Sequence, residues 1–518
     1  MKTLTLILLA FAVTANALNP MYLVGDYAGE SAYNYFGHAL TAGDFDDDGM
    51  EEFVIGAYGW NNNTGKNYFY QYDNGWPAEP YMTVQGSQEY ESYDYSDANL
   101  GDINDDGIPD LGIPIYGFNP QYIGGLDLYF GTVNFDTIAD WSISPSVPIL
   151  YFANYLDSCG DVNNDGGNDF ILTSSYVTDY SPWTELYFAG EILDTIPDWL
   201  IPDDSAVSGI GDINNDGYCD LMLQFQNYEP LSVYFGGNPM DTIPDVILYA
   251  YPTNWLGEGV GDINGDDYPD ICASMHLPDT TGIHGVIYFG GPDFDAEPDF
   301  WLLDEWGEPQ PPLYSIGSGD FNGDGINDIL SGTAHPWYGR VVYIYLGSPW
   351  FNGIPDALVT GGSIIFNFGD NVASGDIDGD GSDELLVTSS NGYSFNTGRV
   401  RLFRGPEEWI DYGAGVKPGE LPHQPGWFTL DQNFPNPFNA ATTIHFELGK
   451  ASLISLIVYD LQGNRIKELI KSKEMILGGY NVSWTGRNET GQPVSSGIYL
   501  LELLVDEYRE VRKMVLVR

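Results

Sequence analysis

Residues 43–52, GDFDDDGMEE, decide the fold, because close copies of this stretch recur along the chain. The other copies are GDINDDGIPD (101–110), GDVNNDGGND (160–169), GDINNDGYCD (211–220), GDINGDDYPD (261–270), GDFNGDGIND (319–328) and GDIDGDGSDE (375–384). Successive copies begin 50 to 59 residues apart, which is the length of one small supersecondary unit. Most of the chain is therefore an array of seven repeats.

Counted from its first aspartate, each copy carries side-chain oxygens at positions 1, 3, 5 and 9 and a variable residue at position 7. Position 6 is glycine in six copies, where the chain must turn sharply, and Asp267 in the fifth, where aspartate tolerates positive φ better than most residues. Alternating hard oxygens, a position 7 carbonyl and a closing carboxylate are the ligand set of calcium, whereas magnesium would keep more water. We therefore expect seven loops that bind calcium.

The expected ligands, with position 7 acting through its carbonyl, are Asp44, Asp46, Asp48, Met50 and Glu52; Asp102, Asn104, Asp106, Ile108 and Asp110; Asp161, Asn163, Asp165, Gly167 and Asp169; Asp212, Asn214, Asp216, Tyr218 and Asp220; Asp262, Asn264, Asp266, Tyr268 and Asp270; Asp320, Asn322, Asp324, Ile326 and Asp328; and Asp376, Asp378, Asp380, Ser382 and Glu384. The loops hold 28 carboxylates, which would repel one another without a cation. We expect about seven structural calcium ions.

Two other structures could explain a single loop of this kind. A solvated Asp-Gly turn is common as a single copy, but seven copies with the same oxygens favour a metal site. An EF-hand closes with Glu at position 12 between two helices, whereas these loops close at position 9 between short β runs such as 53–57 and 385–388.

Charge separates the chain into two regions. The 518 residues include 17 Lys and Arg and 75 Asp and Glu, a net charge of −58, which argues against binding nucleic acid or anionic lipid. Residues 425–518 are neutral, with ten cations and ten acids, so residues 1–424 hold the whole excess. The Gly/Pro-rich stretch between them predicts a linker at 409–426, with domains at 20–408 and 427–518.

The N-terminus has the three parts of a secretory signal peptide, assigned to residues 1–17. Lys2 precedes an apolar run over 4–13, and Ala15-Asn16-Ala17 follows as a cleavage site. No other stretch is apolar enough to span a bilayer, so we expect no membrane span after cleavage. Three cysteines, Cys159, Cys219 and Cys272, do not make a disulfide framework, and small buried side chains in strands are the simplest reading of them.

Each repeat has four short strand patterns: one before the loop, one after it, an aromatic strand that ends in a turn, such as 128–131, and a further segment such as 194–201. Four antiparallel strands repeated seven times predict an all-β fold, a seven-bladed β-propeller. The last repeat ends after three strands, near residue 404, and we expect residues 20–26 to supply its fourth strand and close the ring.

Residues 35–57, YFGHALTAGDFDDDGMEEFVIGA, resemble an FG-GAP repeat, the unit of integrin α-subunit propellers and of many bacterial secreted proteins. Phe36-Gly37 and Gly56-Ala57 are the pairs that give the repeat its name, and they are weaker in later repeats. The resemblance implies a propeller with calcium loops on one rim and a partner-binding surface elsewhere. It does not imply an enzyme.

Residues 427–518 alternate apolar and polar residues in short strands, which predicts a small Ig-like β-sandwich after the propeller. The strings LDQNFPNPFN (430–439), VYDLQG (458–463), SGIY (496–499) and KMVLVR (513–518) resemble the C-terminal sorting domain of type IX secretion cargo. This resemblance implies that the type IX machinery recognises residues 427–518. It places the protein outside the cell or on the outer surface of a Gram-negative-type bacterium. An ordinary adhesive Ig-like module is the alternative.

No HExxH, P-loop, GxSxG or dinucleotide-binding motif is present, and the six histidines are scattered, so we name no catalytic residue and no organic cofactor. The leading hypothesis is a calcium-stabilised, non-catalytic binding or adhesion module for a glycan or an extracellular protein. A calcium-dependent polysaccharide-degrading enzyme, lyase or glycosidase, and a structural surface-layer protein are the alternatives.

Overall fold

The computed structural model describes two compact units, Met1–Asp411 and Tyr412–Arg518, each within the residues that could be placed. In the first unit these are 18–406 and 409, apart from 32, 88, 90–91, 93–96, 116–123, 145–148, 177–181, 190–192, 203, 226–229, 241, 249–250, 277–282, 293, 305–308, 336–337, 350, 362–366 and 390–396. In the second they are 428–517, apart from 431–432, 434, 437, 440, 449–451, 460–464, 477 and 506–507. The expected signal peptide and most of the expected linker lie outside the described residues.

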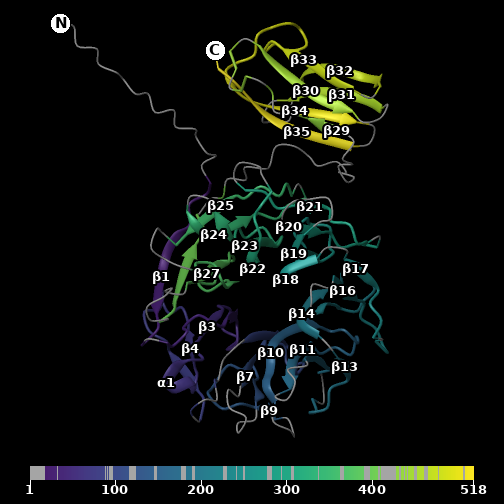
Figure 1. Ribbon diagram of the computed structural model, residues 1–518. Coiled ribbons are helices and arrows are strands. Elements are labelled where there is room, and N and C mark those ends of the chain that lie inside the picture. The colour runs from purple at the N-terminus through teal and green to yellow at the C-terminus, as the bar shows by residue number, and fades with distance from the viewer. Residues whose placement is uncertain are drawn as a thin grey trace, which may run out of the picture. The chain divides into compact units, whose positions relative to one another are not determined.

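The described residues of the first unit form seven four-stranded antiparallel sheets (Figure 1). In chain order they are β2 (Leu40–Gly43), β3 (Glu52–Gly56), β4 (Lys66–Tyr70) and β5 (Met82–Gln85); β6 (Ala98–Gly101), β7 (Asp110–Ile115), β8 (Gly125–Tyr129) and β9 (Trp141–Ile143); β10 (Ile149–Gly160), β11 (Asp169–Tyr176), β12 (Pro182–Tyr187) and β13 (Trp199–Pro202); β14 (Asp204–Gly211), β15 (Asp220–Phe225), β16 (Leu231–Tyr234) and β17 (Val246–Leu248); β18 (Tyr251–Gly261), β19 (Asp270–His276), β20 (Ile283–Tyr288) and β21 (Phe300–Trp301); β22 (Leu313–Gly319), β23 (Asp328–His335), β24 (Gly339–Tyr345) and β25 (Ala357–Thr360); and β26 (Val372–Gly375), β27 (Glu384–Ser389) and β28 (Arg399–Arg404), to which β1 (Tyr22–Ala28) is added. We number these sheets 1 to 7.

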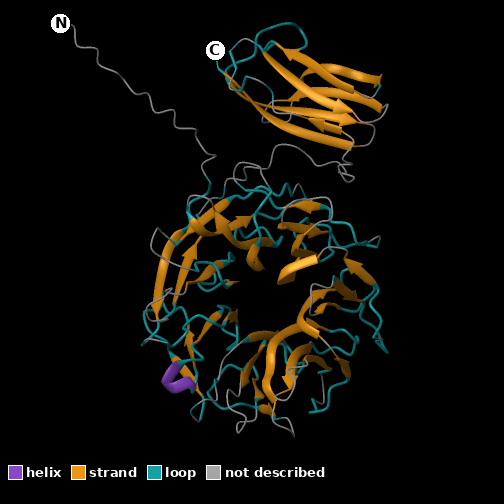
Figure 2. Cartoon of the chain, in the orientation of Figure 1, coloured by secondary structure: helices purple, strands orange, loops and turns teal. Residues whose placement is uncertain are grey.

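The seven sheets follow one another around a ring (Figure 2). The first strand of each sheet contacts the first strand of the next, from β2 through β6, β10, β14, β18 and β22 to β26, and β26 contacts β2 again. The cycle of contacts is therefore closed. Among the described residues the only helix is α1 (Trp60–Asn63), and no helix there is long and apolar enough to cross a membrane.

Strand β1 closes sheet 7, as the sequence predicted, although it begins two residues later than expected. It pairs antiparallel with β28, with Tyr22 opposite Arg404 and Ala28 opposite Arg399. On the edge of this pair, Arg399 donates hydrogen bonds to both carboxylate oxygens of Asp26. Residues from the two ends of the first unit thus share one sheet, which leaves β28 without a free edge.

A separate hydrophobic cluster fills each of the seven junctions between neighbouring sheets. The junction between sheets 7 and 1 is filled in the same way as the others, with Tyr27 of β1 packed against Phe53 and Tyr70 at ring-centroid distances of 5.5 and 4.8 Å. Phe36 of the FG pair is buried in the same cluster, and the N–H of Gly37 donates to the carbonyl of Gly56 in the second named pair. The apolar face of every sheet is thereby covered by its neighbour.

The second unit has two sheets on one core. One contains β29 (Phe428–Leu430), β30 (Thr442–Leu448) and β33 (Gly478–Trp484); the other contains β31 (Ser452–Tyr459), β32 (Arg465–Met475), β34 (Gly497–Val505) and β35 (Tyr508–Leu516). Both contribute to a single cluster of buried side chains that includes Phe446, Trp484 and Leu503. The sequence did not predict β29 or β32. Strand β32 is rich in Lys and Glu because it lies at a sheet edge, where charge discourages pairing with another chain.

Replacing Tyr27 with alanine tests the importance of ring closure. Tyr27 is 6% exposed, so we expect Tyr27→Ala to lower the free energy of unfolding by about 3–5 kcal/mol, as for other buried aromatic truncations. Urea unfolding followed by tryptophan fluorescence measures this. The matched control is Tyr22→Ala on the same strand, where the side chain is 54% exposed and we expect about 0.5 kcal/mol or less. Equal effects of the two substitutions would contradict the role assigned to β1.

Candidate metal centre

All seven predicted loops occupy the same place in their sheets. In each sheet the first strand ends at the glycine before position 1, and the second strand begins at position 9, as with Gly43 and Glu52 in sheet 1. The loops therefore lie at the same edge of the ring, each joining an inner strand to the next strand outward. No helix flanks any of them.

The loops share one set of hydrogen bonds. The carboxylate at position 1 accepts the N–H of position 5 at 2.9–3.1 Å and the N–H of position 6 at 2.7–3.0 Å. The carboxylate at position 5 accepts the N–H of position 7 at 2.9–3.2 Å. Two aspartates thus organise the loop. Position 1 uses both carboxylate oxygens as acceptors and therefore needs an acid, whereas position 5 uses one oxygen.

Two positions in every loop have a left-handed backbone. Position 6 has φ between 71° and 107°, including Asp267 at 71°, so aspartate does adopt the conformation that glycine adopts elsewhere. Position 4 is also left-handed, with φ between 57° and 73°, which the sequence analysis did not predict. The signal was present, because position 4 is always Asp, Asn or Gly, the residues that tolerate this region best.

The carboxylate at position 9 joins the two ends of each loop. One of its oxygens accepts the N–H of position 2 at 2.8–3.2 Å in every copy. Position 2 is always Phe, Ile or Val, and its side chain is at most 1% exposed within the cluster between its own sheet and the next. This apolar anchor was missed in the sequence, where only the oxygen-bearing positions were considered.

Burial makes the charged form of the position 9 carboxylates costly. It raises the pKa of Glu52 to about 9, with a further contribution from the charge of Asp46, and it raises the pKa of Asp110 to about 7. The pKa values of Asp169 and Asp270 rise to about 8 for the same reason, although each accepts two backbone N–H groups. A cation beside these groups would offset the cost of keeping them ionised at neutral pH.

The residues of loops 1 and 7 fit a bound cation best. The carboxylate oxygens of Asp44, Asp46 and Asp48 lie within 4.8 Å of one another, and so do those of Asp376, Asp378 and Glu384. In the same two loops, one oxygen each of Asp46, Glu52, Asp378 and Glu384 is buried without a hydrogen-bond donor. Such oxygens are the expected ligands of a hard divalent ion.

In loops 2 to 6, where position 3 is Asn, no three Asp or Glu side chains of the described chain come as close together as in loops 1 and 7. Asn163 of loop 3 nevertheless has a buried carbonyl oxygen without a hydrogen-bond donor. The ligand roles expected for these loops, and for the position 7 carbonyls throughout, stay predictions.

Neighbouring loops are hydrogen-bonded to one another around the ring. The N–H of position 8 donates to the position 1 carbonyl of the preceding loop at 2.8–3.0 Å, as from Asn168 to Asp102 and from Glu51 to Asp376. Five junctions have this bond. The other two have Pro109 and Pro269 at position 8, and proline has no N–H to donate. The predicted ligand at position 1 is therefore attached to the next sheet at most junctions.

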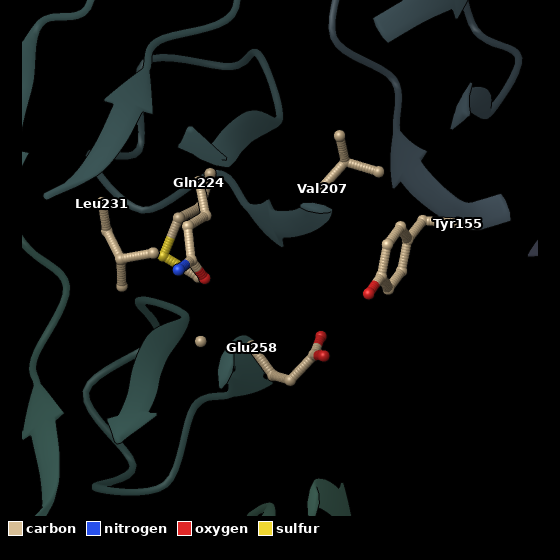
Figure 3. Close-up of a pocket in the computed structure, with 7 residues that line it drawn as sticks. Tyr155, Val207, Gln224, Leu231 and Glu258 are labelled. Carbon is tan, nitrogen blue, oxygen red and sulfur yellow. The ribbon is translucent and has the colours of Figure 1, made fainter. Parts of the chain in front are cut away.

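A small cavity of about 40 Å³ lies away from the loops, beside the inner strands of sheets 3 to 5 (Figure 3). Glu258 reaches toward it and accepts a hydrogen bond from the hydroxyl of Ser208 at 2.9 Å, while Asp157 accepts the N–H of Gly209. These are two carboxylates with raised pKa values, about 6 for Asp157 and about 8 for Glu258, mainly through burial. A space of this size has room for a few water molecules but not for a sugar residue. The three cysteines are all free thiols, and one of them, Cys219, occupies position 8 of loop 4.

The Asp157–Glu258 pair predicts a pH dependence of stability. Because folding raises both pKa values, the folded state binds protons more tightly, and the stabilisation this gives is lost as the pH rises from about 4 through about 8. We expect Glu258→Gln, which can still accept the Ser208 hydroxyl, to raise the melting temperature at pH 9 and to change it little at pH 5. Differential scanning calorimetry at both values measures this. Glu297→Gln, at an exposed site, is the control, and an equal response of the two variants would contradict the prediction.

Comparison with known proteins agrees with the repeats and with the C-terminal unit. The model of the FG-GAP repeat matches residues 36–70, which contain β2 to β4 of sheet 1, and residues 368–403, which contain β26, β27 and most of β28 of sheet 7. The model of the secretion system C-terminal sorting domain matches residues 432–517. Integrin alpha-5 of Xenopus laevis is 32% identical over 110 residues, which is 19% of this chain and 10% of that protein.

A solved structure of PorZ, described as an essential bacterial surface component of the type-IX secretion system of Porphyromonas gingivalis, aligns with 90% of this chain and 64% of its own, at 13% identity and a TM-score of 0.29. The chain thus spans a tenth of the curated relative and less than two thirds of this structure. The chain contains FG-GAP repeats and a type IX secretion sorting domain, and it is a secreted or outer cell-surface protein.

Proposed function

We propose that the ring is a seven-bladed β-propeller held together by calcium, and that it serves outside the cell as a non-catalytic binding or adhesion module. The observation that carries this proposal is the repetition of one loop conformation seven times on one edge of a closed ring. The second unit, with two sheets on one core, would be the Ig-like domain that the type IX secretion machinery recognises.

Calcium is the ion that we propose for the loops. The donors are carboxylate and amide oxygens, which suit calcium better than magnesium, because magnesium demands a strict octahedron and keeps several water ligands. Extracellular calcium modules have dissociation constants of about 10⁻⁴–10⁻³ M, so each occupied loop would add about 0.4–1.4 kcal/mol at about 1 mM calcium. Several loops together would add as much as a typical domain's whole stability. We propose a structural role for the ion and no part in chemistry.

A substitution within loop 1 tests the calcium proposal. We expect chelation to lower the melting temperature by several degrees or more, and Asp48→Asn to remove one bound ion, because asparagine can still accept the N–H of Met50 but carries no charge. Equilibrium dialysis with metal analysis and thermal melts measure both effects. Asp47→Asn is the control in the same loop, since Asp47 is exposed and occupies position 4, where loops 3 and 4 have asparagine. A melting temperature that does not change on addition of chelator would contradict the calcium proposal.

The edge of the ring opposite the loops offers a surface for a partner. A shallow cavity of about 90 Å³ lies there between sheets 7 and 1, at the ends of β2 and β27 remote from their loops. Tyr58 stacks on Tyr35 at 4.6 Å and meets His38 edge-on at 4.7 Å beside it. Tyr33 and Tyr35 both have left-handed φ values, a conformation that costs energy and is often retained at binding sites. Tyr33 is exposed, whereas Tyr35, His38 and Tyr58 are half-buried. Aromatic rings that reach solvent suit a sugar ring or a protein side chain.

Binding and turnover assays separate the proposal from its alternatives. We expect a glycan or extracellular-matrix array to detect binding with no release of reducing or unsaturated sugar. Tyr33→Ala should weaken that binding severalfold, whereas Tyr22→Ala, equally exposed on the outer strand, should not. Release of oligosaccharide would favour the polysaccharide-degrading enzyme, and calcium-driven self-assembly in light scattering would favour the surface-layer protein.

A further inference from the structure

Loop 7 has a cationic side chain of the chain itself among its predicted ligands. Arg404, the last residue of β28, lies with Nη1 3.4 Å from Asp378 and Nε 3.9 Å from Glu384, and Nη2 donates to Asp380. These are positions 3, 5 and 9 of the loop. One guanidinium therefore reaches three of the four side chains expected to hold an ion.

Every sheet has a residue at the position that Arg404 occupies in sheet 7. The residue after position 9, here Leu385, pairs with a residue of the third strand, here Phe403, and Arg404 is the next residue along that strand. The equivalent residue is Gln71 in sheet 1, and Phe130, Phe188, Phe235, Phe289 and Leu346 in sheets 2 to 6. A polar residue thus occurs there only in sheets 1 and 7, the two that meet at the closure of the ring.

The same two loops have Glu instead of Asp at position 9. In loops 2 to 6 both oxygens of that aspartate accept backbone N–H groups, the second from the residue after the Phe or Leu, at 2.6–2.8 Å. In loops 1 and 7 one oxygen of the glutamate accepts the N–H of position 2, and the other is buried without a donor. The second carboxylate oxygen of each glutamate is therefore free to contact a side chain or a bound ion instead of a backbone N–H.

Loops 1 and 7 differ in the charge of that group. The amide of Gln71 donates to Asp46 at 2.8 Å and to Asp48 at 3.0 Å, but it is neutral. Arg404 makes the corresponding contacts with a full positive charge. The negative charge of the loop 1 carboxylates is therefore not neutralised by Gln71, whereas Arg404 neutralises part of the negative charge in loop 7.

We propose that Arg404 is the resident cation of loop 7: it keeps that loop folded without a divalent ion and competes with calcium for the site, whereas loop 1 depends on calcium. This inference rests on the calcium proposal above. The Arg404 side chain is 41% exposed, so it can move aside, and the relation is competition rather than exclusion. The sheet that closes the ring would then stay intact when the calcium concentration falls.

Exchanging the two residues tests the proposal. Arg404→Gln gives loop 7 the residue of loop 1, and Gln71→Arg does the reverse. At the calcium concentration that saturates the tight sites of the native protein, we expect R404Q to bind one more ion and Q71R one fewer, measured by equilibrium dialysis with metal analysis. In chelator, R404Q should melt below the native protein and Q71R at or above it.

The control is Arg399→Gln on the same strand, whose arginine pairs with Asp26 outside the loop. We expect it to leave the number of bound ions unchanged. An unchanged ion count in both R404Q and Q71R would overturn the proposal. If no variant binds calcium, the calcium proposal fails instead, and the melts in chelator still decide the role of Arg404: R404Q melting no lower than R399Q would overturn it.

Discussion

The buried carboxylate at position 9 is the constraint on which the first unit depends. It starts the second strand of each sheet, accepts the N–H of position 2 and so fixes where the loop begins and ends. A charge in that place is costly, as the raised pKa values of Glu52 and Asp270 show. In loops 2 to 6, two backbone hydrogen bonds to this carboxylate reduce the cost. In loops 1 and 7, one oxygen of the glutamate is buried without a hydrogen-bond donor, and a cation beside it would reduce the cost instead.

The loops also connect the sheets. Each places the apolar side chain of position 2 in the cluster shared with the next sheet, and at several junctions the carbonyl of position 2 accepts an N–H from that sheet, as from Thr132 to Phe45. Together with the bonds from position 8 to position 1, this gives a nearly continuous belt of loops around one edge of the ring. An ion bound in one loop would therefore stabilise two sheets, which agrees with a structural role and leaves the opposite edge available for a partner.

The sequence predicted much of this because its signals are local and repeated. The seven loops, the strands that flank them and the left-handed turn at position 6 follow from the oxygen spacing and the glycines, and Asp267 adopts the expected conformation. Strand β1 followed from counting strands, since the last repeat lacked one. Strand β32 was missed because its apolar residues Ile466, Leu469 and Ile470 do not alternate with period two, and its charges reflect an edge position that is known only from the sheet.

By itself, the sequence determined which residues could be ligands, how many repeats there are and that a sorting domain follows them, since each depends on residue types at fixed spacing. Only the tertiary structure decided how those residues are used. Arg404 lies 20 or more residues from the carboxylates it contacts and reaches them because β28 pairs with β27. Likewise, position 8 reaches the preceding loop only because the ring brings two sheets together. Spacing along one strand cannot reveal such contacts, because they depend on which strands become neighbours.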